Sequence, residues 1–142
     1  MNPFPQRRST TVTFLSIGIV VVAALNLVRA IWLWLRISLL TTLPLTAPLW
    51  LLIAAAIVAA LVWGAAGIGL WRLASWSRWL ALAFVVLYHA YNWIIRWQFE
   101  VSDYARLMRP WNMLITVVSI SLTWIILWRP NVRSQFDPIL LR

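Results

Sequence analysis

The chain lacks cysteine and lysine and contains few acidic residues. None of its 142 residues is Cys, which excludes disulfides, iron–sulfur clusters and thiolate zinc sites within the chain. All 12 basic residues are Arg, and the only acids are Glu100, Asp103 and Asp137. Charged residues make up 11% of the chain, against about a quarter in an ordinary soluble domain. We therefore expect a single membrane domain over residues 1–142, with no room for a soluble domain beside it.

Several sequence signatures of catalysis and transport are also missing. No acid lies inside a long apolar run, which argues against carboxylate-coupled ion transport and intramembrane aspartyl proteolysis. There is no HExxH, Walker phosphate loop, CxxC or catalytically spaced Ser–His pair. The two halves of the chain show no internal repeat of the kind found in many transporters. We expect no enzyme activity, no catalytic residue, no metal site and no cofactor.

What the chain does contain is hydrophobic sequence, at 63% of all residues. A helix needs about 20 mostly apolar residues to cross a bilayer. Four runs meet this requirement, at roughly 12–35, 49–71, 79–97 and 111–128. Pro110 is expected at the first position of the fourth helix, where a missing N–H costs nothing. The predicted fold is an all-α, up-down bundle of four transmembrane helices.

The Arg residues predict the orientation of this bundle and one kind of partner. Seven flank the ends of the predicted helices on the side of the termini, and four flank the opposite ends, together with two acids. The positive-inside rule then predicts that both termini lie in the cytoplasm. Because the Arg residues flank apolar runs, we expect anionic lipids as partners and no nucleic acid. The predicted lipid contacts are Arg72, Arg78, Arg129 and Arg133.

The second apolar run carries small residues at helical spacing: Ala56, Ala60, Gly64 and Gly67. Small residues let two helix backbones approach closely in a membrane. We expect this face to pack on a neighbouring helix, in the same chain or in another membrane subunit.

Polar residues form one stripe on each of the other three predicted helices. The first helix carries Asn26 and Arg29, and the fourth carries Asn112, Thr116 and Ser119. The third carries His89, Asn92 and Arg96, so it is the richest in groups that lipid disfavours. Aligning the helices by their interfacial Trp residues places Asn92 level with Thr116, and His89 level with Ser119 and Asn26. We therefore expect a polar layer between the first, third and fourth helices.

This layer has two interpretations. In the first, its side chains hydrogen-bond across helices and fix the packing, with Asn112, Thr116 and Ser119 as packing residues. In the second, it binds a quinone, a pigment or a lipid, because ionisable groups inside a membrane often mark a site. The binding residues would then be Asn26, Arg29, Tyr88, His89, Asn92 and Arg96. We favour the first interpretation, in which His89 has a neighbour and not a ligand.

Two segments combine Trp and Arg with neighbouring apolar runs. One is GIGLWRLASWSRWLALAFVVL at 67–87, in which a basic turn containing Trp joins two apolar runs. The other is LWRPNVRSQF at 127–136, where Pro ends the final helix. Both segments resemble small bacterial membrane proteins of four spans and unknown function. The resemblance implies a compact four-helix unit in a bacterial cytoplasmic membrane and no catalytic residue. We expect a non-catalytic accessory subunit of a larger bacterial membrane complex, for example a respiratory or photosynthetic electron-transfer complex. The alternatives are a ligand-binding subunit that uses the polar layer, and a stand-alone small transporter.

Overall fold

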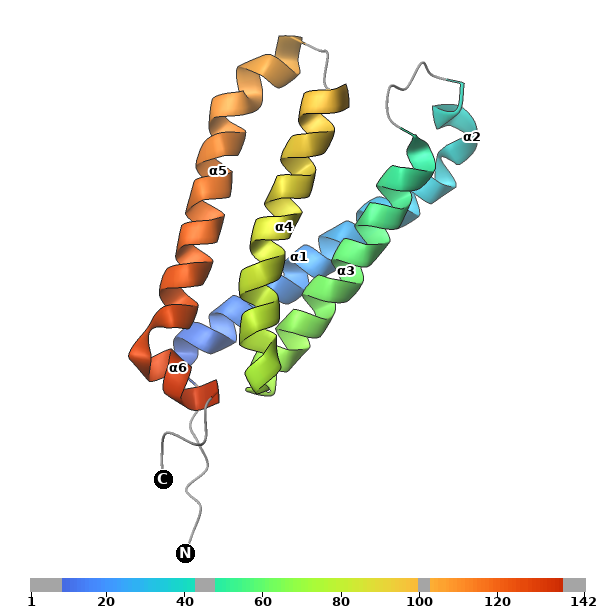
Figure 1. Cartoon of the computed structure of the whole chain (residues 1–142). Helices are drawn as coiled ribbons and strands as arrows, with labels where there is room; N and C mark the ends of the chain where they lie inside the picture. The colour runs from blue at the N-terminus through green and yellow to red at the C-terminus, as the bar shows by residue number, and fades with distance from the viewer. Residues whose placement is uncertain (1–8, 43–47, 100–102, 137–142) are drawn as a thin grey trace, which may run out of the picture.

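The computed structural model describes residues 9–42, 48–99 and 103–136, and every regular element in these ranges is a helix. Four long helices run alternately up and down, with a short helix after the first and another after the last (Figure 1). The elements are α1 (Thr10–Leu35), α2 (Ile37–Leu40), α3 (Leu49–Trp71), α4 (Ser75–Phe99), α5 (Asp103–Trp128) and α6 (Pro130–Phe136). The predicted all-α fold is confirmed.

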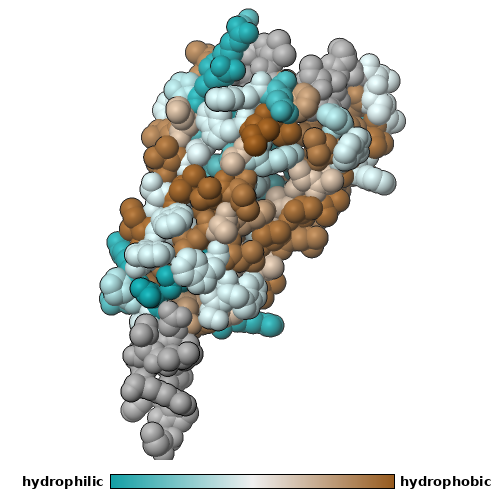
Figure 2. All heavy atoms as spheres, viewed as in Figure 1, coloured by the Kyte–Doolittle hydropathy of each residue, from teal (hydrophilic) through white to brown (hydrophobic). Residues whose placement is uncertain are grey.

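Three helices in the described part of the chain are long and apolar enough to cross a membrane. They are α1, α3 and the segment Arg106–Trp128 of α5. In Figure 2 the apolar residues form a band across the middle of the molecule, and polar residues gather towards its ends. Helix α4 has 25 residues, which is about 37 Å and enough for a bilayer. It lacks the apolarity of the other three because its second half carries His89, Asn92 and Arg96.

The start of α5 differs from the prediction. Pro110 lies inside the helix and not at its first position, because α5 begins at Asp103. Asp103 is favourable in a first turn, where it interacts with the helix dipole, and its carboxylate lies 3.7 Å from the Arg106 guanidinium. Proline removes one backbone hydrogen bond and its ring crowds the carbonyl of Arg106, so a bend is expected here. Figure 1 shows α5 curving near its start.

The four long helices pack together at one end of the molecule and separate into two pairs at the other. Helices α1 and α3 share the most extensive contact, α4 packs on α3, α5 packs on α4, and α1 barely touches α5. Figure 1 shows the α1–α3 pair diverging from the α4–α5 pair away from the termini. At the end near the termini, Leu127, Val132 and Phe136 are buried in one cluster with Val12. We call this the closed end and the opposite end the open end.

The turn between α3 and α4 is built at the closed end by local backbone bonds. The Ala74 N–H donates to the Gly69 carbonyl (2.9 Å) and the Leu73 N–H to the Leu70 carbonyl (3.1 Å). This pattern is a Schellman motif, which requires a left-handed residue, and Leu73 supplies it with φ of 55°. The turn predicted from the basic sequence at 72–78 therefore brings α4 back along α3 without a longer loop.

Candidate functional site

The polar contact between α1 and α4 is made by Asn26 and Tyr88. The Tyr88 hydroxyl donates to Asn26 Oδ1 at 3.3 Å, and Asn26 Nδ2 donates to the Val22 carbonyl at 2.9 Å. Asn26 is only 6% exposed, so both bonds compensate for burying its amide. The Tyr88 ring packs edge-to-face with the buried Trp63 of α3, with 5.9 Å between ring centroids. This contact therefore links three helices.

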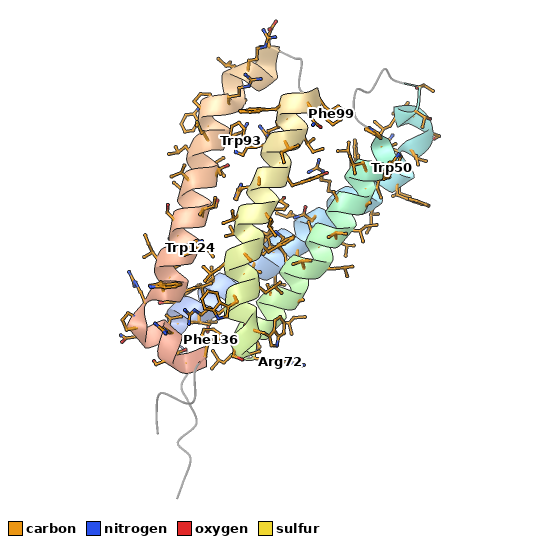
Figure 3. All side chains as sticks on the ribbon, viewed as in Figure 1. Trp50, Arg72, Trp93, Phe99, Trp124 and Phe136 are labelled. Carbon is orange, nitrogen blue, oxygen red and sulfur yellow. The ribbon has the colours of Figure 1, made fainter. Side chains whose placement is uncertain are left out.

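The polar contact between α4 and α5 centres on the Thr116 hydroxyl. Trp93 Nε1 donates to Thr116 Oγ1 at 3.1 Å, and His89 Nδ1 lies 3.3 Å from the same oxygen. The Thr116 hydroxyl donates its own proton to the Asn112 carbonyl at 2.8 Å. Figure 3 shows the labelled Trp93 extending from α4 between the two helices. Three polar groups from two helices thus converge on one oxygen.

The polar layer expected between α1, α4 and α5 exists, with different partners. Thr116 bonds to His89 and Trp93, one turn apart on α4, and not to Asn92, whose amide donates to the Tyr88 carbonyl of its own helix at 2.7 Å. Ser119, expected opposite His89, donates to the Ile115 carbonyl of its own helix at 2.6 Å. The observed cross-helix bonds thus join Asn26 to Tyr88 and Thr116 to two side chains of α4.

The two arginines predicted for this layer differ in burial. Arg29 is exposed on α1, and Arg96 is half-buried on α4. Trp93 was not among the residues predicted for the layer, although its indole bonds to Thr116. Its position four residues after His89 places it on the same helical face, which is the signal that could have identified it.

Apolar spaces lie on both sides of α4. A groove of about 620 Å³ runs between α4 and α5 towards the open end, beside Trp93, Trp97 and Arg109. A second space of about 490 Å³ lies between α1, α4 and α5 and is lined by Tyr88 and His89 among others. A third, of about 330 Å³, lies between α3 and α4. Tyr88 and Tyr91 both line the third space.

The small-residue face of α3 lies against α1. A Cβ built on Gly67 would lie 2.7 Å from Val20 Cγ2, and one built on Gly64 would lie 4.0 Å from the Ala23 Cβ. Ala56 is 4% exposed, whereas Ala60 is half-buried. The partner of this face is therefore a helix of the same chain.

The predicted lipid contacts at the closed end divide into two groups. Arg72, Arg129 and Arg133 are exposed. Arg78 is only 3% exposed, so it differs from the prediction of a headgroup contact. Its guanidinium carbon lies 5.1 Å from the ring centroid of Trp79 and 5.4 Å from that of Trp128. Burial between two Trp rings makes Arg78 part of the helix packing, through cation–π attraction.

The arrangement joins helices and encloses apolar space. In the described residues, no group of three or more His, Cys, Asp or Glu side chains could hold a metal ion. The chemistry available to the layer is hydrogen bonding by hydroxyl, amide, indole and imidazole groups. No family model, curated protein or solved structure matches this chain, so its function must be inferred from its own residues and geometry.

Proposed function

We propose that this chain is a non-catalytic, four-span subunit of a larger bacterial membrane complex, with both termini in the cytoplasm. The observation that carries the proposal is the poor coverage of α5. Within the apolar segment of α5, 11% of the residues are buried inside the protein, against 33% for α3. A helix held mainly along one face leaves its other faces for lipid or for a partner.

The divergence of the helix pairs supports a protein partner. A membrane protein that functions alone gains dispersion energy when its hairpins close on each other. Here the pairs separate towards the open end, and grooves remain on both sides of α4. A helix of a neighbouring subunit would fill such a groove with the contacts that the chain does not make itself.

Membrane crossing by α4 belongs to the same proposal. Its length suffices, and its polar groups His89, Asn92 and Trp93 are hydrogen-bonded to protein atoms. Hydrogen bonding lowers the cost of placing such groups in lipid. A crossing α4 would return the chain to the side of the N-terminus after α5.

Purification of the complex under mild conditions tests the subunit proposal. The tagged chain is extracted from its native membrane in a mild detergent, and the mass and composition of the particle are measured. We expect a particle much heavier than 16.4 kDa that contains other membrane subunits in fixed ratio. A monomer without stoichiometric partners would overturn the proposal. Subunits that carry haem or iron–sulfur centres would identify the electron-transfer type of complex.

Photocrosslinking then locates the partner. A benzoylphenylalanine is placed at Val118 on α5, which is 46% exposed, and in a second variant at Leu25 on α1, which is 62% exposed. We expect protein adducts from Val118 and lipid adducts from Leu25, since α1 already packs extensively on α3. Protein adducts from Leu25 alone would place the interface on α1 and contradict the role of α5.

A further inference from the structure

The space of about 490 Å³ between α1, α4 and α5 has an apolar side and a polar side. Helix α1 contributes Phe14, Gly18 and Val22 to the apolar side. The polar side is formed by His89 of α4 and by Ser119 and Thr123 of α5. Spaces of a few hundred Å³ with a few polar groups in an apolar lining are typical of small-molecule sites.

The two hydroxyl groups on the polar side have already used their protons. Ser119 donates to the Ile115 carbonyl at 2.6 Å, and Thr123 donates to the Ser119 carbonyl at 2.8 Å. A hydroxyl group has one proton and two lone pairs. Both oxygens can therefore only accept a further hydrogen bond.

The contacts of Thr116 determine which nitrogen of His89 carries the proton. The Thr116 proton goes to the Asn112 carbonyl at 2.8 Å, the shorter of the two bonds open to it. Thr116 Oγ1 is then an acceptor for His89, so His89 Nδ1 must be the protonated nitrogen. In a neutral imidazole the other nitrogen, Nε2, has a free lone pair. His89 thus adds a third acceptor.

The donors near this space are engaged or covered. The Tyr88 hydroxyl donates to Asn26 Oδ1 at 3.3 Å. Trp63 of α3 also lines the space, and its indole N–H has no hydrogen-bond partner within the described residues; the nitrogen is buried under protein atoms, so the ring borders the space without presenting its N–H there. The lining side chains therefore offer a ligand acceptors and no available donor.

We propose that this space binds an apolar phenol or hydroquinone whose hydroxyl group donates to His89 Nε2 or to the hydroxyl oxygens beside it. The oxygen atoms of the corresponding quinone or ether carry lone pairs and no proton. On entering the space they would lose the hydrogen bonds that they accept outside it and would face the lone pairs of the protein. The space therefore favours the form of the ligand whose hydroxyl group carries a proton that it can donate. It follows from the helix packing of one chain and does not require the partner subunit proposed above.

Photolabelling of the isolated chain in lipid nanodiscs tests the proposal. The probes are a long-chain alkylphenol with a diazirine in its tail, and its methyl ether. We expect the phenol to label peptides of α1, α4 and α5, and the ether to label them about tenfold less, the factor for one lost hydrogen bond. Unlabelled hydroquinone should compete, and the matching quinone should not. Equal labelling by phenol and ether would overturn the proposal.

Two variants and a control locate the site. Gly18→Leu adds a side chain beside the space, where an added Cβ meets no atom within 4 Å, and should abolish the phenol preference. His89→Phe keeps a ring but removes the acceptor, and should reduce the preference. Ser16→Ala removes a hydroxyl that also donates to its own helix, to the Val12 carbonyl at 2.8 Å, but lies outside the space, and should change nothing. Labelling that is unaffected by Gly18→Leu would place the ligand elsewhere.

A separate experiment measures which nitrogen of His89 carries the proton. Because the chain contains one His, selective ¹⁵N labelling of histidine gives the signals of this residue alone. We expect the spectrum of the tautomer protonated at Nδ1, which is the minor form of free imidazole side chains in water. The spectrum of the Nε2 tautomer would show that Nε2 is a donor, and would overturn the assigned ligand class even if folding and assembly were intact.

Discussion

The four glycines of the chain form a graded test of helix packing, because the space around each is different. A Cβ built on Gly69 would lie 2.5 Å from the Ser77 Cβ and 2.8 Å from Trp76 Cη2. The first contact is roughly 1 Å shorter than the ordinary carbon–carbon separation of about 3.5–4.0 Å. The Ser77 Cβ is fixed to the backbone of α4, so the first turn of α4 would have to move.

Gly69→Ala should therefore destabilise the protein. Overpacking of this kind costs about 1–3 kcal/mol. Replacing Gly by Ala inside a helix stabilises the helix by up to about 1 kcal/mol. With the full gain subtracted, the expected net loss in the free energy of unfolding is up to about 2 kcal/mol.

The other glycines serve as matched controls. Around Gly18 an added Cβ meets no atom within 4 Å, and at Gly64 its nearest neighbour is 4.0 Å away. Gly18→Ala and Gly64→Ala should therefore raise the free energy of unfolding by up to about 1 kcal/mol. At Gly67 the nearest atom is a methyl carbon of Val20, at 2.7 Å, on an exposed side chain that can shift outward, so Gly67→Ala should fall between these limits.

The assay is unfolding by sodium dodecyl sulfate in mixed micelles, followed by circular dichroism of the helices. We expect the midpoints to rank as Gly18→Ala and Gly64→Ala above the unaltered chain, and Gly69→Ala below it. If Gly69→Ala unfolds at the same detergent fraction as Gly18→Ala, the close approach of α3 to the start of α4 is not a feature of the protein.

Three further predictions concern the polar layer, the aromatic core and the topology. Thr116→Val should lower the free energy of unfolding by about 1–2 kcal/mol in the same assay, because it leaves two donors on α4 without their acceptor. Trp63→Leu should cost about 2–4 kcal/mol through lost ring contacts, whereas Trp50→Leu, at a side chain 70% exposed, should change stability by less than about 0.5 kcal/mol. Single cysteines at Thr41 and Ser134 should react with a membrane-impermeant maleimide from opposite sides of the membrane. Reaction of both from one side would show that α4 does not cross.

Helices α1 and α3 were the most predictable, because their apolar runs are longer than the about 20 residues that a helix needs to span a bilayer. The predicted segment 49–71 has the same bounds as α3, and the predicted segment 12–35 differs from α1 by two residues at its start. The start of α5 was not predictable in this way. Apolarity marks where lipid begins, whereas Asp103 begins the helix through its own electrostatics, before the apolar run.

The partners within the polar layer were harder to predict than its location. Helical period and depth placed the stripes correctly on α4 and α5, because both follow from the sequence alone. Which side chains bond depends on helix rotation of a few tens of degrees, which no pattern in one sequence specifies. Trp93 and His89 therefore share Thr116, while Asn92 and Ser119 bond to their own helices. For the same reason the sequence did not indicate that Arg78 is buried while Arg72 is exposed.

The polar layer can hold the helices together and still provide a site, because the two roles use different atoms. In the proposed tautomer, the packing role takes the Nδ1 proton of His89, which lies 3.3 Å from Thr116 Oγ1, and Nε2 remains as an acceptor. The bonds of Ser119 and Thr123 to their own helix likewise use the protons and leave the lone pairs. The bond to a neighbour therefore determines the kind of ligand that His89 can accept. A space whose accessible side chains offer only acceptors would admit membrane-soluble donors and exclude their oxidised or methylated counterparts.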